Sequence, residues 1–207
     1  MAVARTSIAT GERAEARRRE LLDAADRVIR RRGPDASMDE IAAAAGITKP
    51  ILYRHFGNKS GLYAALAVRY MQRFFEVSES ALAETHPRKR IAKAVDAYLQ
   101  AVEREPEIFR FVRRATIEQQ EARDAASAEL DRHAAAVARP IRRNLEEIGL
   151  DPEPADAWAY GVVGMVQFVA GWWLETRSLP RERLVDQLTA LLWEGFGHLH
   201  EAPARYG

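Results

Sequence analysis

The chain has 207 residues, enough for one or two small domains, and an ordinary balance of 47% apolar and 29% charged residues. It contains no cysteine, which excludes disulfides and thiolate metal sites and is compatible with a reducing cytoplasm. The net charge is only +1, yet residues 1–60 carry 12 Lys and Arg against 8 Asp and Glu. This basic part predicts a polyanionic partner, although a solvated, Arg-rich helix face would account for the same charges.

No secretory or membrane segment is expected. Residues 1–13 lack the apolar run of a signal peptide. The most apolar segment, residues 158–174, contains Tyr160, Gln167 and three glycines. It is shorter than the roughly 20 residues of a membrane span, so we interpret it as a buried core helix of a cytoplasmic protein.

Helices account for the whole chain. Alternating apolar and polar runs are absent, whereas apolar residues recur at helical spacing between Gly, Pro and capping residues. A flexible basic arm over residues 1–10 is expected before Thr10 caps the first helix. Nine helices are expected, near residues 11–32, 38–45, 49–55, 58–84, 88–105, 106–122, 125–148, 154–176 and 180–200. The prediction is an all-α protein with two domains, 1–57 and 58–207, and the fourth helix would connect them rigidly.

The segment SMDEIAAAAGITKPILYRHFGNKSGL, which begins at Ser37, holds the strongest local pattern. Ser37 and Glu40 form a capping box for one short helix, and Gly46 supplies a sharp turn. Thr48 caps the next helix, whose Pro50 lies in the first turn, where an N–H is not needed. Two short helices joined in this way predict a helix-turn-helix, in which the second helix enters the major groove of DNA.

The candidate DNA contacts lie on the outward side of this motif. Basic side chains can donate to guanine or phosphate, apolar ones can contact a thymine methyl, and hydroxyls at helix starts can bind phosphate. The tyrosine and the histidine could equally serve as core or capping residues. The candidates are Ser37, Thr48, Lys49, Pro50, Ile51, Tyr53, Arg54, His55 and Lys59.

The same segment resembles the N-terminal domain of the tetracycline-repressor (TetR) family. The residues that carry the resemblance are Ile41-Ala42, Ala45-Gly46, Thr48, Leu52-Tyr53, His55-Phe56, Lys59 and Leu62-Tyr63. It covers about residues 15–65; the rest is similar to the family's regulatory domain in length and helix count only. The resemblance implies a homodimeric transcriptional regulator, usually a repressor, that leaves a near-palindromic DNA operator when a small ligand binds.

The last two helices are candidates for the dimer interface. Glycines in the eighth helix would allow close approach, and two helices from each chain would form a four-helix interface. A core within one chain is the alternative. The candidate interface residues are Trp158, Val162, Val166, Leu184, Leu188, Leu191, Leu192 and Phe196.

A ligand pocket is expected in the C-terminal domain, where aromatic residues and a few polar groups mix. A long apolar pocket would suit a lipophilic inducer such as an acyl chain or a hydrophobic drug. Aromatic residues at helical spacing are also typical of a core. The candidate ligand contacts are Tyr98, Phe109, Val112, Arg113, Met165, Gln167, Phe168 and Trp172.

An enzyme is not expected. The sequence has no set of Glu-x-x-His pairs for a di-iron site, no glycine-rich phosphate loop and no cysteine nucleophile. His198 and His200 are two residues apart and cannot share a helix face. We therefore expect no catalytic residue, cofactor or metal site, and a helical protein-binding adaptor is the remaining alternative.

Overall fold

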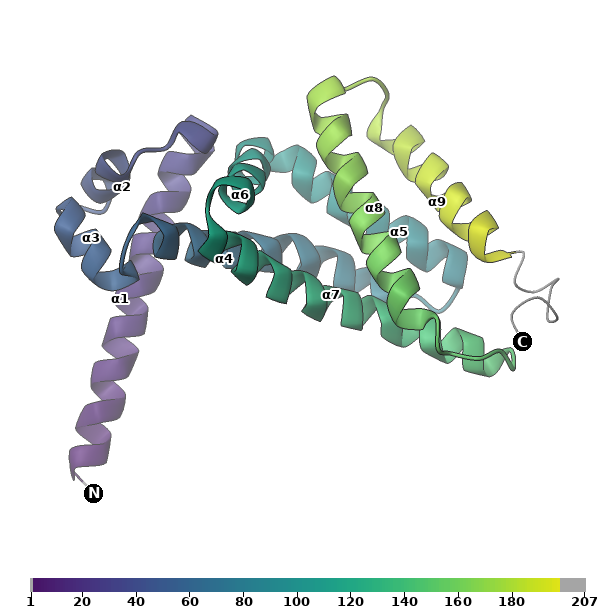
Figure 1. The fold of residues 1–207 in the computed structure, drawn as a ribbon, viewed down its shortest axis with the longest axis horizontal. Coiled ribbons are helices and arrows are strands. Elements are labelled where there is room, and N and C mark those ends of the chain that lie inside the picture. Colours follow the sequence, from purple (N-terminus) through teal and green to yellow (C-terminus); the bar gives the residue numbers. More distant parts are fainter. Residues whose placement is uncertain (1, 198–207) are drawn as a thin grey trace. The chain divides into compact units, whose positions relative to one another are not determined.

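The computed structural model describes the backbone of residues 2–197 and the side chains of residues 13–195. Within this range the chain forms nine α-helices and two short 3-10 helices and no strand, which confirms the all-α prediction (Figure 1). The α-helices are α1 (Ala2–Arg32), α2 (Met38–Ala44), α3 (Lys49–Phe56), α4 (Lys59–Glu79), α5 (Pro87–Arg104), α6 (Pro106–Glu118), α7 (Gln120–Glu147), α8 (Ala155–Thr176) and α9 (Arg181–Gly197). The 3-10 helices are η1 (Gly33–Asp35) and η2 (Ser80–Ala83).

The described residues divide into two compact units. Unit 1 comprises the residues up to Tyr70 together with Glu107–Ala126, and unit 2 comprises Met71–Pro106 and the residues from Ser127 onward. Helices α4 and α7 contribute to both units. The division differs from the expected boundary after residue 57, because α6 and the first part of α4 group with the helix-turn-helix.

Helix α1 begins earlier than its sequence predicted. Its first residue is Ala2, so residues 2–10 are helical where a flexible arm was expected. The stretch contains three Ala and one Arg and has neither Gly nor Pro. Nothing in it stops a helix, and Thr10 is therefore an interior position rather than a cap.

The core of unit 1 is built around aromatic residues that α4 and α6 share. The ring of Phe111 meets Tyr63 edge-to-face at 4.9 Å between centroids and Tyr70 at 6.4 Å. The Tyr63 hydroxyl donates to the carbonyl of Ala36, 3.4 Å away. Edge-to-face pairs of this kind add about 0.5–1.5 kcal/mol beyond area burial. Helix α6 therefore completes the core on which the helix-turn-helix is mounted.

The first turn of α4 approaches the end of α3 so closely that position 61 has no room for a side chain. The Asn58 side-chain oxygen caps α4 by accepting the Gly61 N–H at 2.8 Å. A Cβ added to Gly61 would lie 2.0 Å from the carbonyl oxygen of Phe56. A backbone oxygen cannot rotate away as the end of a long side chain can, so the α3–α4 junction requires glycine here.

Gly61→Ala is expected to lower the free energy of unfolding by about 1–3 kcal/mol, because the added methyl forces α3 and α4 apart. Urea unfolding followed by far-ultraviolet circular dichroism measures the change. The matched control is Gly161→Ala in α8, where no atom of the same chain lies within 4 Å of the added Cβ. Introduced together with Phe168→Asp, so that a subunit contact through α8 does not contribute, that substitution is expected to be neutral or stabilising relative to Phe168→Asp alone. Equal losses in the two variants would contradict the proposed steric cause.

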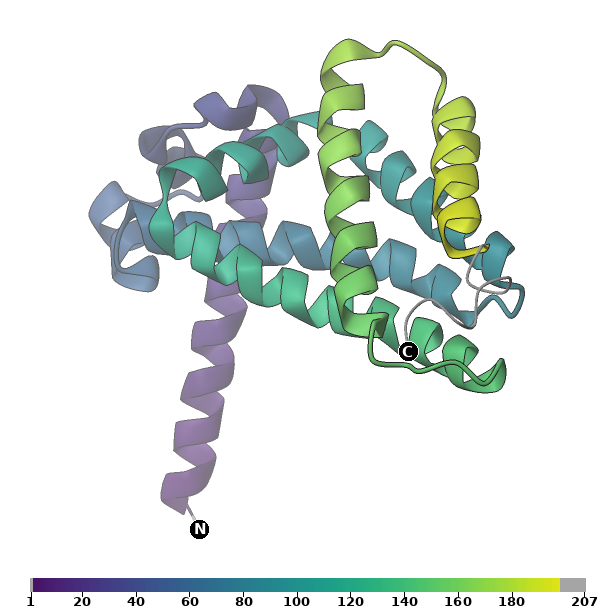
Figure 2. The ribbon, with the colours of Figure 1, turned by 45° about the vertical axis from the view of Figure 1, so that its right-hand side comes forward.

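Unit 2 is organised around α5, which packs against both α8 and α9. Helices α8 and α9 run antiparallel and are joined by a short loop (Figure 2). The indole of Trp173 is buried and donates to the carbonyl of Leu179 at 2.8 Å, which fixes that loop to α8. The Arg181 guanidinium pairs with Asp96 and, at 3.2 Å, with Glu103. These ion pairs tie the start of α9 to α5.

Candidate DNA-binding surface and ligand cavity

The α2–turn–α3 segment has the local geometry that its sequence predicts. The Ser37 hydroxyl accepts the Glu40 N–H at 3.1 Å, and the Glu40 carboxylate accepts the Ser37 N–H at 3.0 Å, which completes the capping box. Gly46 has φ +67°, and its N–H donates to the carbonyl of Ala43. The N–H of Ile47 donates to the carbonyl five residues earlier. These two bonds form a Schellman turn, which ends α2 and sets the direction of α3.

One side of α3 is fixed in the core of unit 1. Leu52 is fully buried and Phe56 is 8% exposed. The guanidinium of Arg18 on α1 lies 4.4 Å from the centroid of the Phe56 ring, and it donates to the carbonyl of His55 at 3.1 Å. Arg18 thereby satisfies a carbonyl at the end of α3 that has no partner within the helix. The helix is held from behind and at its C-terminal end.

The opposite side of α3 faces outward. None of the nine candidate DNA contacts belongs to the buried core of the described residues. Ser37, Thr48, Pro50, Arg54 and Lys59 are exposed, and Lys49, Ile51, Tyr53 and His55 are half-buried.

Two basic candidates already have partners within the chain. The Lys49 ammonium pairs with the Asp39 carboxylate at 3.2 Å, and the Lys59 ammonium lies 5.1 Å from the centroid of the Tyr63 ring. Both lysines are at the surface, where such pairs contribute little and exchange readily for a phosphate.

The start of α3 offers hydrogen-bond donors to an anion. Thr48 occupies the N-cap position, but its side chain makes no capping hydrogen bond, which corrects the predicted cap. Pro50 has no N–H, so the donors of this first turn are the N–H groups of Lys49 and Ile51. The Thr48 side chain does not accept a hydrogen bond from either of them. Those groups have no partner within the helix. The hydroxyl and the two N–H groups form a local arrangement suited to one phosphate.

Thr48→Ala and Ser37→Ala are expected to separate phosphate binding from capping. Loss of the Thr48 hydroxyl should leave the free energy of unfolding unchanged within about 0.5 kcal/mol, yet weaken binding to all DNA sequences by up to about tenfold. Loss of the Ser37 hydroxyl should lower the free energy of unfolding by about 1 kcal/mol. Urea unfolding and fluorescence anisotropy with labelled duplexes measure the two effects. Similar destabilisation by both substitutions would show that Thr48 is a cap.

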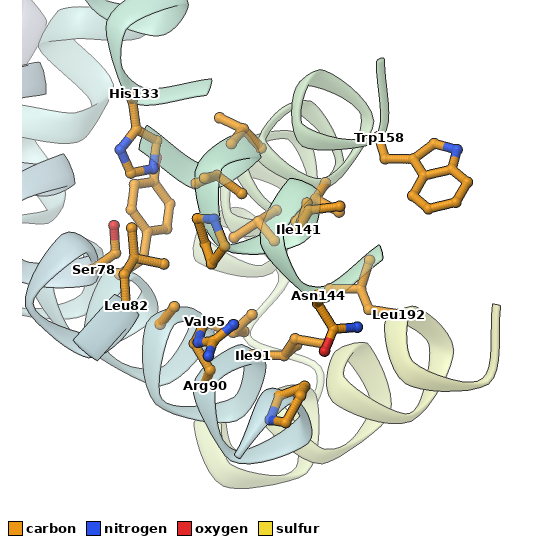
Figure 3. A pocket seen from close by; sticks show the side chains of 18 of the residues that line it. Ser78, Leu82, Arg90, Ile91, Val95, His133, Ile141, Asn144, Trp158 and Leu192 are labelled. Atoms are coloured by element: carbon orange, nitrogen blue, oxygen red, sulfur yellow. The ribbon is translucent and has the colours of Figure 1, made fainter. Parts of the chain in front are cut away.

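Unit 2 contains a cavity of about 170 Å³ between α4, α5, α7, α8 and α9 (Figure 3). For scale, an apolar cavity of about 150 Å³ accommodates benzene. Apolar side chains make up most of its wall. The polar residues among its lining are Ser78, Arg90, Tyr98, His133, Asn144 and Gln167.

The cavity includes only part of the predicted ligand pocket. Tyr98 and Gln167 line it. Phe109 and Val112 are buried in unit 1, where Arg113 is exposed; on α8, Met165 is half-buried off the cavity, and Phe168 and Trp172 are exposed. On α6, Phe111 packs against Tyr63 and Tyr70 of α4 within unit 1. On α8, Trp158 lines the cavity, whereas Phe168 and Trp172 are exposed. The candidate ligand contacts therefore move to the cavity wall.

The candidate dimer residues are also redistributed. Trp158, Val162, Val166 and Leu192 line the cavity, Leu184 and Leu188 are buried within their own chain, and Leu191 is 59% exposed. The side chain of Phe196 lies outside the described residues. The α9 stripe packs inward because α5 covers it. Apolar exposure is found instead at Tyr160, Phe168, Trp172 and Leu191.

Helix α8 is long and apolar enough by composition to cross a membrane, with a mean hydropathy of 1.2 over 18 residues. Only 39% of that window is buried. The helix has two apolar sides for separate reasons. One side lines the cavity with Val162, Val163 and Val166, and the other exposes Phe168 and Trp172.

Sequence reasoning predicted Tyr98 and Gln167 but missed the other polar residues of the cavity wall, which are Ser78, Arg90, His133 and Asn144. Pro87, Ile91, Ala94, Val95 and Tyr98 form one stripe of α5 at helical spacing, and Arg90 lies within that stripe. In the same way, His133 and Asn144 interrupt the stripe of α7 that contains Val137, Ile141, Leu145 and Ile148. A charged or polar residue inside an apolar stripe is the signal that would have found them.

His133 is held firmly at the cavity wall. Its ring is 6% exposed and stacks on Phe75 with the centroids 4.0 Å apart. The Nδ1 atom lies 2.9 Å from the Glu79 carboxylate. Burial lowers the pKa of His133, and the Glu79 hydrogen bond opposes this shift only in part. The ring is therefore neutral at pH 7, which leaves a polar but uncharged group facing an apolar space.

Comparisons with known proteins cover both units. Residues 21–66 match the family described as bacterial regulatory proteins, tetR family, and residues 77–207 match the tetracyclin repressor-like C-terminal domain. An uncharacterised HTH-type transcriptional regulator of Mycobacterium tuberculosis, Rv0472c, is 32% identical over 188 residues, which are 90% of this chain and 80% of that protein. The transcriptional activator FasR of Mycolicibacterium smegmatis is also 32% identical over 188 residues, with coverages of 88% and 84%.

A solved structure shares the fold. The TetR-like transcriptional regulator from Rhodococcus sp. RHA1 is 28% identical, with a TM-score of 0.62 over 87% of this chain and 96% of that chain. Together with the exposed second helix of the helix-turn-helix, these matches establish the family and a non-enzymatic role. The protein belongs to the TetR family of helix-turn-helix transcriptional regulators.

Proposed function

We propose that the protein acts as a cytoplasmic homodimeric repressor that binds a near-palindromic operator and is released by a small lipophilic ligand. The observation that carries the DNA-binding part is the geometry of α3. Its inner side is locked by Leu52 and Phe56, while Thr48 and Arg54 are exposed on its outer side. In a two-fold dimer, two such helices would enter successive major grooves about 34–36 Å apart.

The exposed apolar residues of unit 2 support the homodimer. Phe168 is 82% exposed, Leu191 59%, Trp172 46% and Tyr160 45%. Large apolar side chains gathered on α8 and α9 are costly in water, and such patches typically mark interfaces. A two-fold arrangement would bury the same face of both copies, and it would place a DNA-binding unit on each.

Chain continuity supports a response to ligand. Asn58 caps α4 directly after α3, and the same helix reaches the cavity with Phe75 and Ser78. A ligand that favours one arrangement of α4 would therefore favour one separation of the two α3 helices in the dimer. Couplings of this kind are typically worth about 1–3 kcal/mol, or roughly 5–150-fold in operator affinity.

We base the repressor role on the family, in which repression is usual. The relative FasR, by contrast, is an activator, so the direction of regulation needs its own test. Transcription from a promoter that carries the selected operator, with and without the protein, decides this point. Repression predicts less transcript when the protein is added, and an increase would overturn that part of the proposal.

Selection of bound DNA from random duplexes tests the proposal as a whole. The expected outcome is an inverted repeat whose half-sites are one helical turn apart. Binding should weaken steeply with salt, with log K falling by about 0.9 per phosphate neutralised for each unit of log salt concentration. A protein-binding adaptor would enrich no sequence and would show no such slope.

A further inference from the structure

The Arg90 guanidinium occupies an unusual place for a permanent charge. The apolar stripe of α5 that faces the cavity contains Ile91, Val95 and Tyr98, and Arg90 lies in this stripe and lines the same cavity. Figure 3 shows its side chain among the lining residues. Placing a charge beside apolar walls is unfavourable unless an opposite charge or several hydrogen bonds offset the lost hydration.

Within the chain, Arg90 is only partly compensated. It donates to the main-chain carbonyls of Glu84 and Thr85 at 2.7 and 3.2 Å. No carboxylate of the described residues forms an ion pair with it. The two acids whose charges act on Arg90 are both paired elsewhere. Glu147 is paired with Arg143 at 3.8 Å, and Glu84 is paired with Lys93, which holds the pKa of Glu84 at about 2.

Neighbouring charges do not neutralise Arg90. Burial and the charge of Arg143 lower its pKa, and the charges of Glu147 and Glu84 only partly oppose them. The guanidinium stays protonated at pH 7, because an arginine side chain does not lose its proton in proteins. Its charge therefore remains available to an anion that enters the cavity.

Asn144 supplies a second donor at the same end of the cavity. It lines the cavity from α7, and its side-chain amide has no hydrogen-bond partner among the described residues. In Figure 3, Asn144 lies on the far side of the cavity from His133 and Ser78, with Arg90 between Leu82 and Ile91. Eleven residues of α7 separate His133 from Asn144, a rise of about 16 Å. The cavity thus has a charged end and a long apolar wall.

We propose that the cavity binds a medium-length aliphatic carboxylate, whose carboxylate group pairs with Arg90 and Asn144 and whose tail lies along α7 and α8. The inference rests on the proposed ligand-responsive function and specifies its ligand class. Arginine and carboxylate match in charge and in the geometry of two parallel hydrogen bonds. The apolar wall contributes binding free energy in proportion to the tail that it covers.

Two alternative roles for Arg90 lead to different binding preferences. Arg90 could serve only to hold the carbonyls of the loop before α5, in which case it would not discriminate between head groups. The cavity could instead accept any lipophilic molecule, in which case an alcohol of the same length would bind as well as the carboxylate. A comparison of head groups on one tail separates these cases.

Isothermal titration calorimetry of the full chain with octanoate, 1-octanol and octylamine at pH 7.5 provides the test. Octanoate is expected to bind at least about tenfold more tightly than 1-octanol, because one charge-assisted hydrogen bond is worth a factor of this size. Octylamine should bind most weakly, since its charge repels Arg90. No preference for octanoate in the wild-type protein, or no octanoate binding, would overturn the proposal.

Substitutions at Arg90 test whether this residue causes the preference for octanoate over 1-octanol. Arg90→Met keeps an unbranched apolar stem without the guanidinium and is expected to abolish the preference for octanoate while leaving 1-octanol binding unchanged. Arg90→Gln retains donors for the loop carbonyls without the charge, so it gives the same test if Arg90→Met fails to fold. Lys89→Met removes one positive charge at the exposed neighbouring position and should preserve the preference. Persistence of the preference in both Arg90 variants would contradict the proposed anchor.

Operator binding, measured in the same samples, distinguishes this proposal from the proposed function. Arg90-dependent octanoate binding with unchanged operator affinity would support the carboxylate site and contradict ligand-controlled DNA binding. Release from the operator by 1-octanol and octanoate at equal concentrations would support ligand control and contradict the carboxylate site.

Discussion

Phe168→Asp is expected to convert the proposed homodimer into a monomer and to lower its affinity for a two-half-site operator by about 100-fold or more. Phe168 is the most exposed large apolar residue described, and an aspartate in its place would put two carboxylates into the proposed interface of α8 and α9. A monomer loses the second half-site contact, and linked contacts of this kind contribute factors of about 10²–10⁴. Affinity for a single half-site should be unchanged.

Sedimentation equilibrium measures the oligomeric state, and fluorescence anisotropy measures both DNA affinities. The matched control is Ile117→Asp on α6, which introduces the same charge at a residue that is 70% exposed in unit 1. This control should remain dimeric. A Phe168→Asp protein that stays dimeric, or a monomer that binds the full operator as tightly as the wild type, would contradict the proposed interface.

The helix-turn-helix was predictable because its signals are local. Ser37 and Glu40 cap α2 through bonds that span three residues, and the Gly46 turn needs only its neighbours. Such features depend on the identity of residues within one turn of helix, which the sequence states directly. The detail that failed was the Thr48 cap, because a side chain at an N-cap position can also point away from its helix.

The lining of the cavity and the exposed apolar residues of unit 2 were less predictable, because they depend on which helices pack against each other. Helical spacing predicted that Phe109 and Val112 lie on the buried side of their helix, and both are buried. It could not show that they belong to the core of unit 1 rather than to the cavity wall. The same limit applies to Leu188, which faces its own chain. Periodicity predicts which side of a helix is buried, but it does not predict which helix packs against that side.

The requirement for glycine at position 61 could not be predicted either. A single glycine in the first turn of a predicted helix forms no sequence pattern that would mark it as necessary. The requirement for it arises from the 2.0 Å approach of its would-be Cβ to the backbone of α3, which exists only once both helices are in place. The cavity residue Arg90 differs, because its position inside an apolar stripe could have been noticed in the sequence.

Leu52→Ala and Ile51→Ala are expected to separate the two sides of α3. Leu52 is fully buried in the core of unit 1, so its truncation should lower the free energy of unfolding by about 2–5 kcal/mol. Unit 1 would then be partly unfolded at physiological temperature, and binding to every DNA sequence would weaken together. Urea unfolding and operator binding at two temperatures measure these effects.

Ile51 is the adjacent residue and is only half-buried, so it serves as the matched control. Its truncation should cost less than about 1 kcal/mol of unfolding free energy. If Ile51 contacts a thymine methyl, the loss of affinity should be confined to operators that carry that base, because an apolar contact to a methyl discriminates between bases. Destabilisation equal to that of Leu52→Ala would place Ile51 in the core. Base reading would then be left to the exposed Pro50 and Arg54 and the half-buried Lys49, and the proposed contact between Ile51 and a thymine methyl would fail.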